Sequence, residues 1–109
     1  MISGNGRASN APDRLQPASR DSITLALALE SRFVELCGTY FRIKGSPLTI
    51  PDNLKQDALR WREFMARVAK GDRRIKRSEL LGIRSMCQWT LNLNQQLRNQ
   101  PTTLLQWKD

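Results

Sequence analysis

The residues with the clearest chemical character in this chain are basic and closely spaced. Six lysines and arginines lie within eleven positions, with a single carboxylate among them. They are Arg67, Lys70, Arg73, Arg74, Lys76 and Arg77. Because each such side chain that meets a polyanion releases condensed counterions, phosphate is the natural ligand of this segment. If four to six of them reach phosphates, the slope of log Kobs against log salt should be roughly −4 to −5 for duplex DNA.

The charge excess of the whole chain is concentrated around this segment. The chain has 109 residues and a formal net charge of +8. Residues 55–84 hold ten cations and four carboxylates, so they carry +6 of that charge. Runs of like charge also form solvated faces or bind acidic protein surfaces, and both alternatives stay open beside nucleic acid.

Polar side chains continue along the segment that follows the six cations. Arg84 and Gln88 fall in the same quadrant of a helical wheel as Arg77, and no carboxylate occurs at positions 80–108. Arginine and glutamine hydrogen-bond phosphates and base edges, whereas an acidic residue would repel the backbone. We therefore predict that Arg84, Gln88 and Arg60 flank the six cations in a nucleic-acid site. A plain amide-rich solvated surface is the alternative for this polar side.

Catalytic chemistry finds little support in the sequence. The chain has no histidine, which removes the usual general base and the commonest metal ligand. It has no glycine-rich phosphate loop and no cluster of carboxylates typical of a two-metal site. We expect no enzymatic activity, no cofactor and no metal.

The two cysteines and the apolar run near the start indicate the compartment. Cys37 and Cys87 each lie in an apolar helical pattern, and we expect reduced core thiols, with a disulfide between them left open. The apolar run at 23–29 is too short for a membrane span and lacks the flanks of a signal peptide. We therefore expect a cytoplasmic protein that does not contact a membrane.

The distribution of apolar residues predicts a small all-α domain. Residues 1–21 hold almost no large apolar side chain and are predicted to form a flexible, disordered arm. The remainder, 22–109, is predicted to form a bundle of three helices, with a possible short fourth turn near the C-terminus. Caps, prolines and glycines place these helices at about 22–42, 52–70 and 78–99.

The apolar face of the first predicted helix is unusually wide. Its apolar positions cover roughly 200° of the wheel, because the main sector is extended by Ile23, Leu27, Val34 and Phe41. A face of that width predicts a helix packed on two sides, at the centre of the fold.

The segment 76–87 resembles the turn of a helix-turn-helix motif, with Gly82 in the turn and Ile83 as the buried residue after it. The resemblance fails at Gln88, where that family has an apolar residue. An uninterrupted helix explains the apolar spacing better, with Gly82 tolerated at a cost of about 1 kcal/mol.

Together these patterns predict a non-catalytic module that binds the phosphate backbone of DNA or RNA, alone or as a small subunit of a nucleoprotein complex. The alternative is a helical adaptor or inhibitor. In that case the same basic residues would meet an acidic protein partner, and the wide apolar faces would complete a homo-oligomeric or hetero-oligomeric interface.

Overall fold

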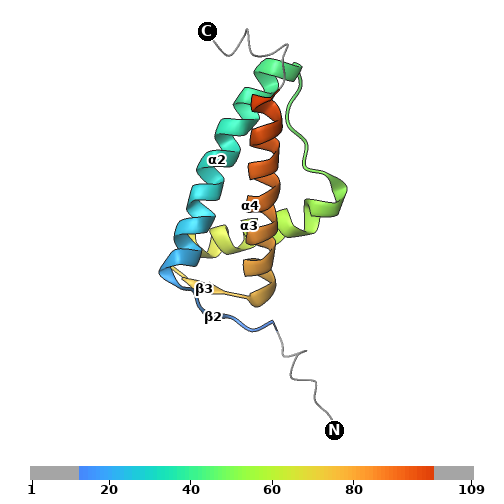
Figure 1. Ribbon diagram of the computed structural model, residues 1–109. Helices are drawn as coiled ribbons and strands as arrows, with labels where there is room; N and C mark the ends of the chain where they lie inside the picture. The colour runs from blue at the N-terminus through green and yellow to red at the C-terminus, as the bar shows by residue number, and fades with distance from the viewer. Residues whose placement is uncertain (1–12, 100–109) are drawn as a thin grey trace.

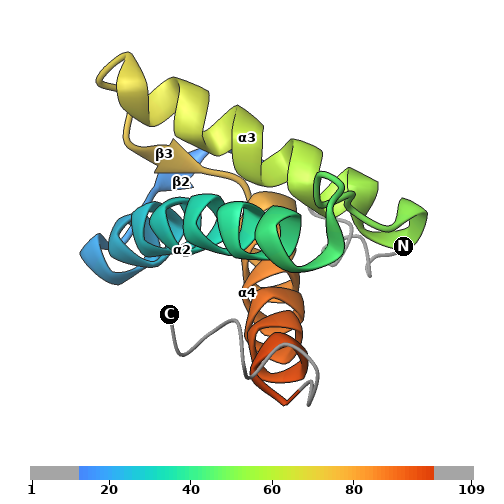
Figure 2. The same ribbon diagram turned by 90° about the horizontal axis from the view of Figure 1, so that it is seen from above.

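The computed structural model describes residues 13–99, which form three long helices. They are α2 (Arg20–Lys44), α3 (Lys55–Ala69) and α4 (Arg77–Arg98). Helices α2 and α4 run in the same direction, and α3 crosses them (Figures 1 and 2). The predicted all-α bundle of three helices is confirmed. The predicted C-terminal turn falls after residue 99 and so lies outside the described residues.

Two short elements complete the described chain. A single 3-10 turn, η1 (Asp52–Leu54), leads into α3. Two strands of two residues, β2 (Gln16–Pro17) and β3 (Arg74–Ile75), pair antiparallel below the helices, as Figure 1 shows. No strand was expected from the sequence, because neither pair shows an alternating apolar pattern.

Local capping fixes the ends of α2. The Ser19 hydroxyl accepts a hydrogen bond from the Ser22 backbone N–H at 3.1 Å, which satisfies one of the open amides of the first turn. At the other end Gly45 adopts φ 77°, and its N–H donates to the Phe41 carbonyl at 2.8 Å. The helix is therefore two residues longer at each end than its predicted bounds of 22 and 42.

Glycine also ends α3, one residue before its predicted bound of 70. Gly71 has φ 91°, a conformation that side chains with a Cβ rarely adopt, and its N–H donates to the Val68 carbonyl at 2.9 Å. The chain then turns sharply, since the Asp72 N–H donates to the Arg67 carbonyl at 2.9 Å. This turn sends the basic segment back toward α4.

Helix α4 is continuous through Gly82. The helix-turn-helix interpretation of this segment is therefore wrong, and the uninterrupted helix predicted from apolar spacing is confirmed. The first turn is stabilised by Glu79, whose Oε1 accepts a hydrogen bond from the Lys76 backbone N–H at 2.9 Å.

The core forms where α3 crosses the other two helices. Phe64, Ile83 and Met86 are fully buried at its centre. Trp61 is 6% exposed, and its indole Nε1 donates to the Ala26 carbonyl at 3.3 Å. A buried indole N–H needs such a partner, so this bond ties α3 to α2. The remaining buried members of the cluster are Ala26, Leu29, Ala58 and Ile75.

Helix α2 is not the centre of the fold, contrary to the expectation from its wide apolar face. It buries Ala26, Leu29 and Leu36 on one side. Three of the four residues that widened the face on the wheel are exposed: Leu27 at 47%, Val34 at 66% and Phe41 at 55%. The fourth, Ile23, is half-buried against the core. Helix α4, which packs against both α2 and α3, holds the central position.

Gly82 lies where α3 and α4 approach closely. A Cβ at this position would come within 3.1 Å of the Asp57 carbonyl oxygen and 3.3 Å of the Arg60 Cβ. These contacts are closer than ordinary van der Waals separations, and one of them is to backbone. Gly82 therefore serves helix packing, which the sequence analysis did not anticipate.

We predict that Gly82→Val destabilises the protein by about 2–3 kcal/mol, because the new side chain must push α3 away from α4. The matched control is Ser85→Val, an exposed position of the same helix, where a change within about 0.5 kcal/mol is expected. Urea unfolding followed by circular dichroism measures both. Equal effects of the two substitutions would contradict the close packing at Gly82.

The N-terminal segment differs from the predicted arm over the residues that the structure describes. Between residues 13 and 21 the chain is bonded to the domain: β2 pairs with β3, and the Ala18 N–H donates to the Arg73 carbonyl at 2.9 Å. Helix α2 already begins at Arg20. The predicted boundary at residue 21 is therefore too far along the chain, and residues 1–12 lie outside the described part.

Both cysteines are free and half-buried. Burial raises the pKa of the Cys37 thiol and of the Cys87 thiol, which lowers their thiolate fraction and hence their reactivity. Within residues 13–99, no helix is both long enough and apolar enough to cross a membrane.

Candidate nucleic-acid interface

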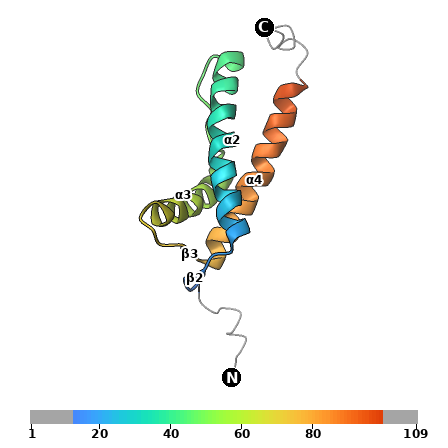
Figure 3. The same cartoon turned by 90° about the vertical axis from the view of Figure 1, so that its left-hand side faces the viewer.

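The six predicted cations lie on the connection between α3 and α4. This stretch leaves the end of α3, passes through β3 and enters α4 at one end of the molecule (Figures 1 and 3). Its backbone is held by the pairing of β3 with β2, in which Gln16 faces Ile75 and Pro17 faces Arg74. The side chain of Ile75 is buried in the core and so holds this connection against the helices. A basic segment that would otherwise be a loop therefore has a fixed course.

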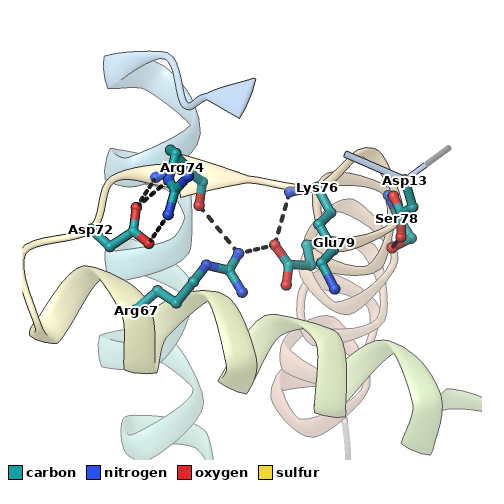
Figure 4. Close-up of polar contacts among 7 residues, drawn as sticks. All are labelled: Asp13, Arg67, Asp72, Arg74, Lys76, Ser78 and Glu79. Carbon is teal, nitrogen blue, oxygen red and sulfur yellow. Dashed lines mark hydrogen bonds and ion pairs between the residues drawn. The ribbon is translucent and has the colours of Figure 1, made fainter. Parts of the chain in front are cut away.

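Arg67 forms the main ion pair beneath this connection. Its Nη2 donates to Glu79 Oε1, in a contact between α3 and the first turn of α4 (Figure 4). The Glu79 side chain is 1% exposed and that of Arg67 22% exposed. The hydrogen bond to Glu79 raises the pKa of Arg67, so the guanidinium stays charged.

Arg67 also supports the strand above it. The same Nη2 donates to the Arg74 carbonyl at 3.2 Å, so one guanidinium joins α3, β3 and α4. We assign Arg67 a structural role, because a phosphate that approached it would compete with a buried carboxylate. In the sequence, by contrast, Arg67 is one of the six cations predicted to bind phosphate.

Arg74 is paired with Asp72, a carboxylate two residues earlier in the chain. Its Nε and Nη2 donate to the two carboxylate oxygens of Asp72, each at 2.9 Å (Figure 4). The Arg74 backbone N–H donates to the same carboxylate at 3.2 Å. These hydrogen bonds lower the pKa of Asp72. The pair is exposed, so Arg74 can exchange this partner for a phosphate more readily than Arg67 can.

Of the six predicted cations, four have no acidic partner among residues 13–99. We call these residues, Lys70, Arg73, Lys76 and Arg77, the basic edge. Lys70, Arg73 and Arg77 are exposed, and Lys76 is half-buried. They follow one another along the connection from the end of α3 to the first residue of α4.

The three flanking residues differ in their availability. Arg60 is half-buried and pairs with Asp57 at 3.9 Å on α3. Arg84 and Gln88 are exposed on α4, and the Gln88 amide donates to the Asn92 side chain at 3.1 Å. Arg84 therefore extends the basic edge along α4 as a charged group, whereas Gln88 already has a hydrogen-bond partner.

The N-terminal segment adds residues that the sequence analysis did not place here. Asp13 accepts hydrogen bonds from the Ser78 backbone N–H at 2.9 Å and from the Ser78 hydroxyl (Figure 4). It thus caps α4 from 65 residues away. The β2–β3 pairing brings Arg14 and Arg20, both exposed, to the same end of the molecule. No local pattern in the sequence indicates a contact between segments so far apart.

Replacing Asp13 tests this distant cap. We expect Asp13→Ala to lower the free energy of unfolding by about 0.5–1 kcal/mol, because the first turn of α4 loses an acceptor. Hydrogen bonds from Ser78 lower the pKa of Asp13. The Asp13 carboxylate therefore contributes its full stabilisation above the ordinary carboxyl pKa, and this stabilisation is lost as the pH falls through the lowered pKa.

The control for this prediction is Asp13→Asn, which keeps an acceptor but cannot ionise. It should retain part of the stability at neutral pH and lose the acid dependence that Asp13 contributes. Urea unfolding at neutral pH and across the acid range measures both effects. An unchanged stability of Asp13→Ala at neutral pH would show that the cap contributes nothing.

The charged side chains at this surface are mainly cations. Within residues 13–99, no group of three or more cysteine, aspartate or glutamate side chains is placed to hold a metal ion. The basic edge presents its cations on a backbone that the pairing of β3 with β2 holds in place. Arg74 in the same stretch is paired with Asp72, and the ion pair of Arg67 with Glu79 lies beneath it. Comparisons of the chain with protein-family models, with curated proteins and with solved structures found no match.

Proposed function

We propose that this protein binds the phosphate backbone of nucleic acid through the basic edge and has no catalytic role. The observation that carries the proposal is the set of four cations, Lys70, Arg73, Lys76 and Arg77, that lack an acidic partner among the described residues. A polyanion that meets all four would release about four condensed counterions, which drives binding without reading sequence. The module would act alone or as a small subunit of a nucleoprotein complex.

Contacts through side chains fit this surface better than contacts through a helix end. Helix N-termini often bind phosphate with their open backbone amides. At the start of α4, however, the Ser78 N–H is already bonded to the carboxylate of Asp13, and the Lys76 N–H to Glu79. Phosphates would therefore meet the lysine and arginine side chains of the basic edge, and Arg84 would flank these four contacts on α4.

The proposal is tested by fluorescence anisotropy of labelled duplex DNA, single-stranded DNA and RNA, each titrated with the protein at several salt concentrations. We expect micromolar or tighter binding of at least one ligand near physiological salt, weakening steeply as salt rises. The preferred ligand then defines the class of nucleic acid. If none of the three nucleic acids binds at low salt, the proposal is wrong.

A second candidate is an acidic protein partner. Leu81 is 48% exposed and lies one helical turn from both Arg77 and Arg84 on α4. An apolar side chain between two arginines suits a protein surface that offers both carboxylates and an apolar contact. Leu81→Ala discriminates the two candidates, because it should leave nucleic-acid affinity unchanged and weaken a protein complex.

A further inference from the structure

An exposed stripe runs along the side of α2 that faces away from the core. Three large apolar residues recur at intervals of seven: Leu27, Val34 and Phe41, exposed at 47%, 66% and 55%. A seven-residue repeat keeps side chains on one seam of a helix and is the spacing of helix–helix interfaces. Helix α2 packs on α4, and over a smaller area on α3, through the side that carries Ala26 and Leu29. Within residues 13–99, nothing covers this seam.

Small residues alternate with the large ones along the same seam. These small residues are Thr24, Ser31 and Gly38, and all three are exposed. Each lies three residues before one of the large residues, so the small and the large residues occupy the two core positions of a heptad repeat. A Cβ built on Gly38 would meet nothing within 4 Å, so this position is an open depression. The outer face of α2 therefore presents three projections and three depressions in alternation.

We infer that a second copy of this chain covers the stripe, with the two α2 helices packed antiparallel. In an antiparallel pair each core position of one type meets a position of the other type on the partner helix. Setting Ser31 opposite Val34 of the second copy places Gly38 opposite Leu27 and Thr24 opposite Phe41. Every layer then joins one small and one large side chain, so the depressions of each helix receive the projections of the other.

The charges beside the stripe favour this orientation and register. In the antiparallel pair, Asp21 of one copy lies beside Arg42 of the other at each end of the interface, and both residues are exposed. A parallel pair would instead set Glu30 of one copy beside Glu35 of the other, which places like charges together. Two identical antiparallel helices are related by a two-fold axis, which makes both ends of the interface equivalent. The interface therefore closes as a dimer.

The first experiment measures mass by sedimentation equilibrium of the full chain from micromolar to millimolar concentration. We expect the mass to rise toward twice the 12.5 kDa of one chain. Val34→Glu should remain monomeric throughout, because its carboxylate would be buried in the dimer yet solvated in the monomer. Leu91→Glu, at an equally exposed apolar position (59%) on α4, should dimerise like the unaltered protein.

The second experiment tests the antiparallel register by charge exchange. Asp21→Arg alone and Arg42→Asp alone should each weaken the dimer roughly fivefold to tenfold, since two ion pairs become two repulsive contacts. The double exchange should restore the affinity. Circular dichroism of each variant at dilute concentration checks that the monomer is folded.

Three results would overturn the inference. One is a mass that stays at that of a single chain up to millimolar concentration. Another is a dimer abolished by Leu91→Glu and unaffected by Val34→Glu, which would place the interface on α4. The third is a double exchange that dimerises no better than the single ones, since Asp21 and Arg42 would then lie apart.

Discussion

Arg67→Met should lower the free energy of unfolding by about 3 kcal/mol, because it leaves the carboxylate of Glu79 buried without its counter-ion. Glu79 is 1% exposed, and its Oε1 would keep the Lys76 N–H as hydrogen-bond donor. One neutral donor does not compensate a buried charge. Urea unfolding at neutral pH gives the change directly.

The double variant Arg67→Met with Glu79→Gln serves as the control. Glutamine keeps the acceptor for the Lys76 N–H and removes the buried charge, so we expect it to regain at least half of the lost stability. A loss below about 1 kcal/mol for Arg67→Met would show that Arg67 does not secure this junction.

Reversing three exposed charges of the basic edge should abolish nucleic-acid binding without unfolding the protein. Lys70→Glu, Arg73→Glu and Arg77→Glu together remove three phosphate contacts and add three repulsive charges. We expect a loss of affinity on the order of a hundredfold or more at moderate salt. Fluorescence anisotropy measures the loss, and an unchanged far-UV helical spectrum shows that the fold persists.

A matched control separates the basic edge from net charge alone. Arg32→Glu, Lys55→Glu and Arg98→Glu reverse three exposed cations away from the edge. Both triple variants take the net charge from +8 to +2, since each reversal removes two units. The control should retain binding within roughly tenfold, the loss expected from the weaker overall field. Equal losses in the two variants would mean that no particular surface is recognised.

The described helices were predictable because most of their ends are set by local chemistry. Pro51, Gly71 and the Ser19 cap of α2 act within a few positions of the chain, whereas the Asp13 cap of α4 does not. The effects of the local residues are therefore visible in sequence. The three helices appear within about two residues of their expected bounds, with η1 forming the predicted first turn of α3.

The role of Arg67 could not be predicted in the same way. Its partner Glu79 lies twelve positions away on another helix, and the pair forms only because Gly71 and Asp72 turn the chain back. In the sequence Arg67 is one more cation in a basic run. Burial distinguishes it from Lys70 and Arg73, and burial depends on the tertiary fold.

The position of α2 was mispredicted for a related reason. A helical wheel shows how wide an apolar face is, but not which part of it the rest of the chain can cover. Here α3 and α4 both pack on the side of Ala26 and Leu29, which leaves Val34 exposed. The pairing of β2 with β3 was missed because it joins residues nearly sixty positions apart through backbone groups, which carry no side-chain signal.

The measurement that tests the account most directly is the salt dependence of nucleic-acid binding, compared between the unaltered protein and the double variant Arg73→Gln and Arg77→Gln. Four phosphate contacts at the basic edge predict a slope of log Kobs against log salt of about −3.6 for duplex DNA, and two contacts predict about −1.8. A slope that is halved by the two substitutions supports phosphate binding through the basic edge. A slope near zero, or one that the substitutions leave unchanged, would contradict it.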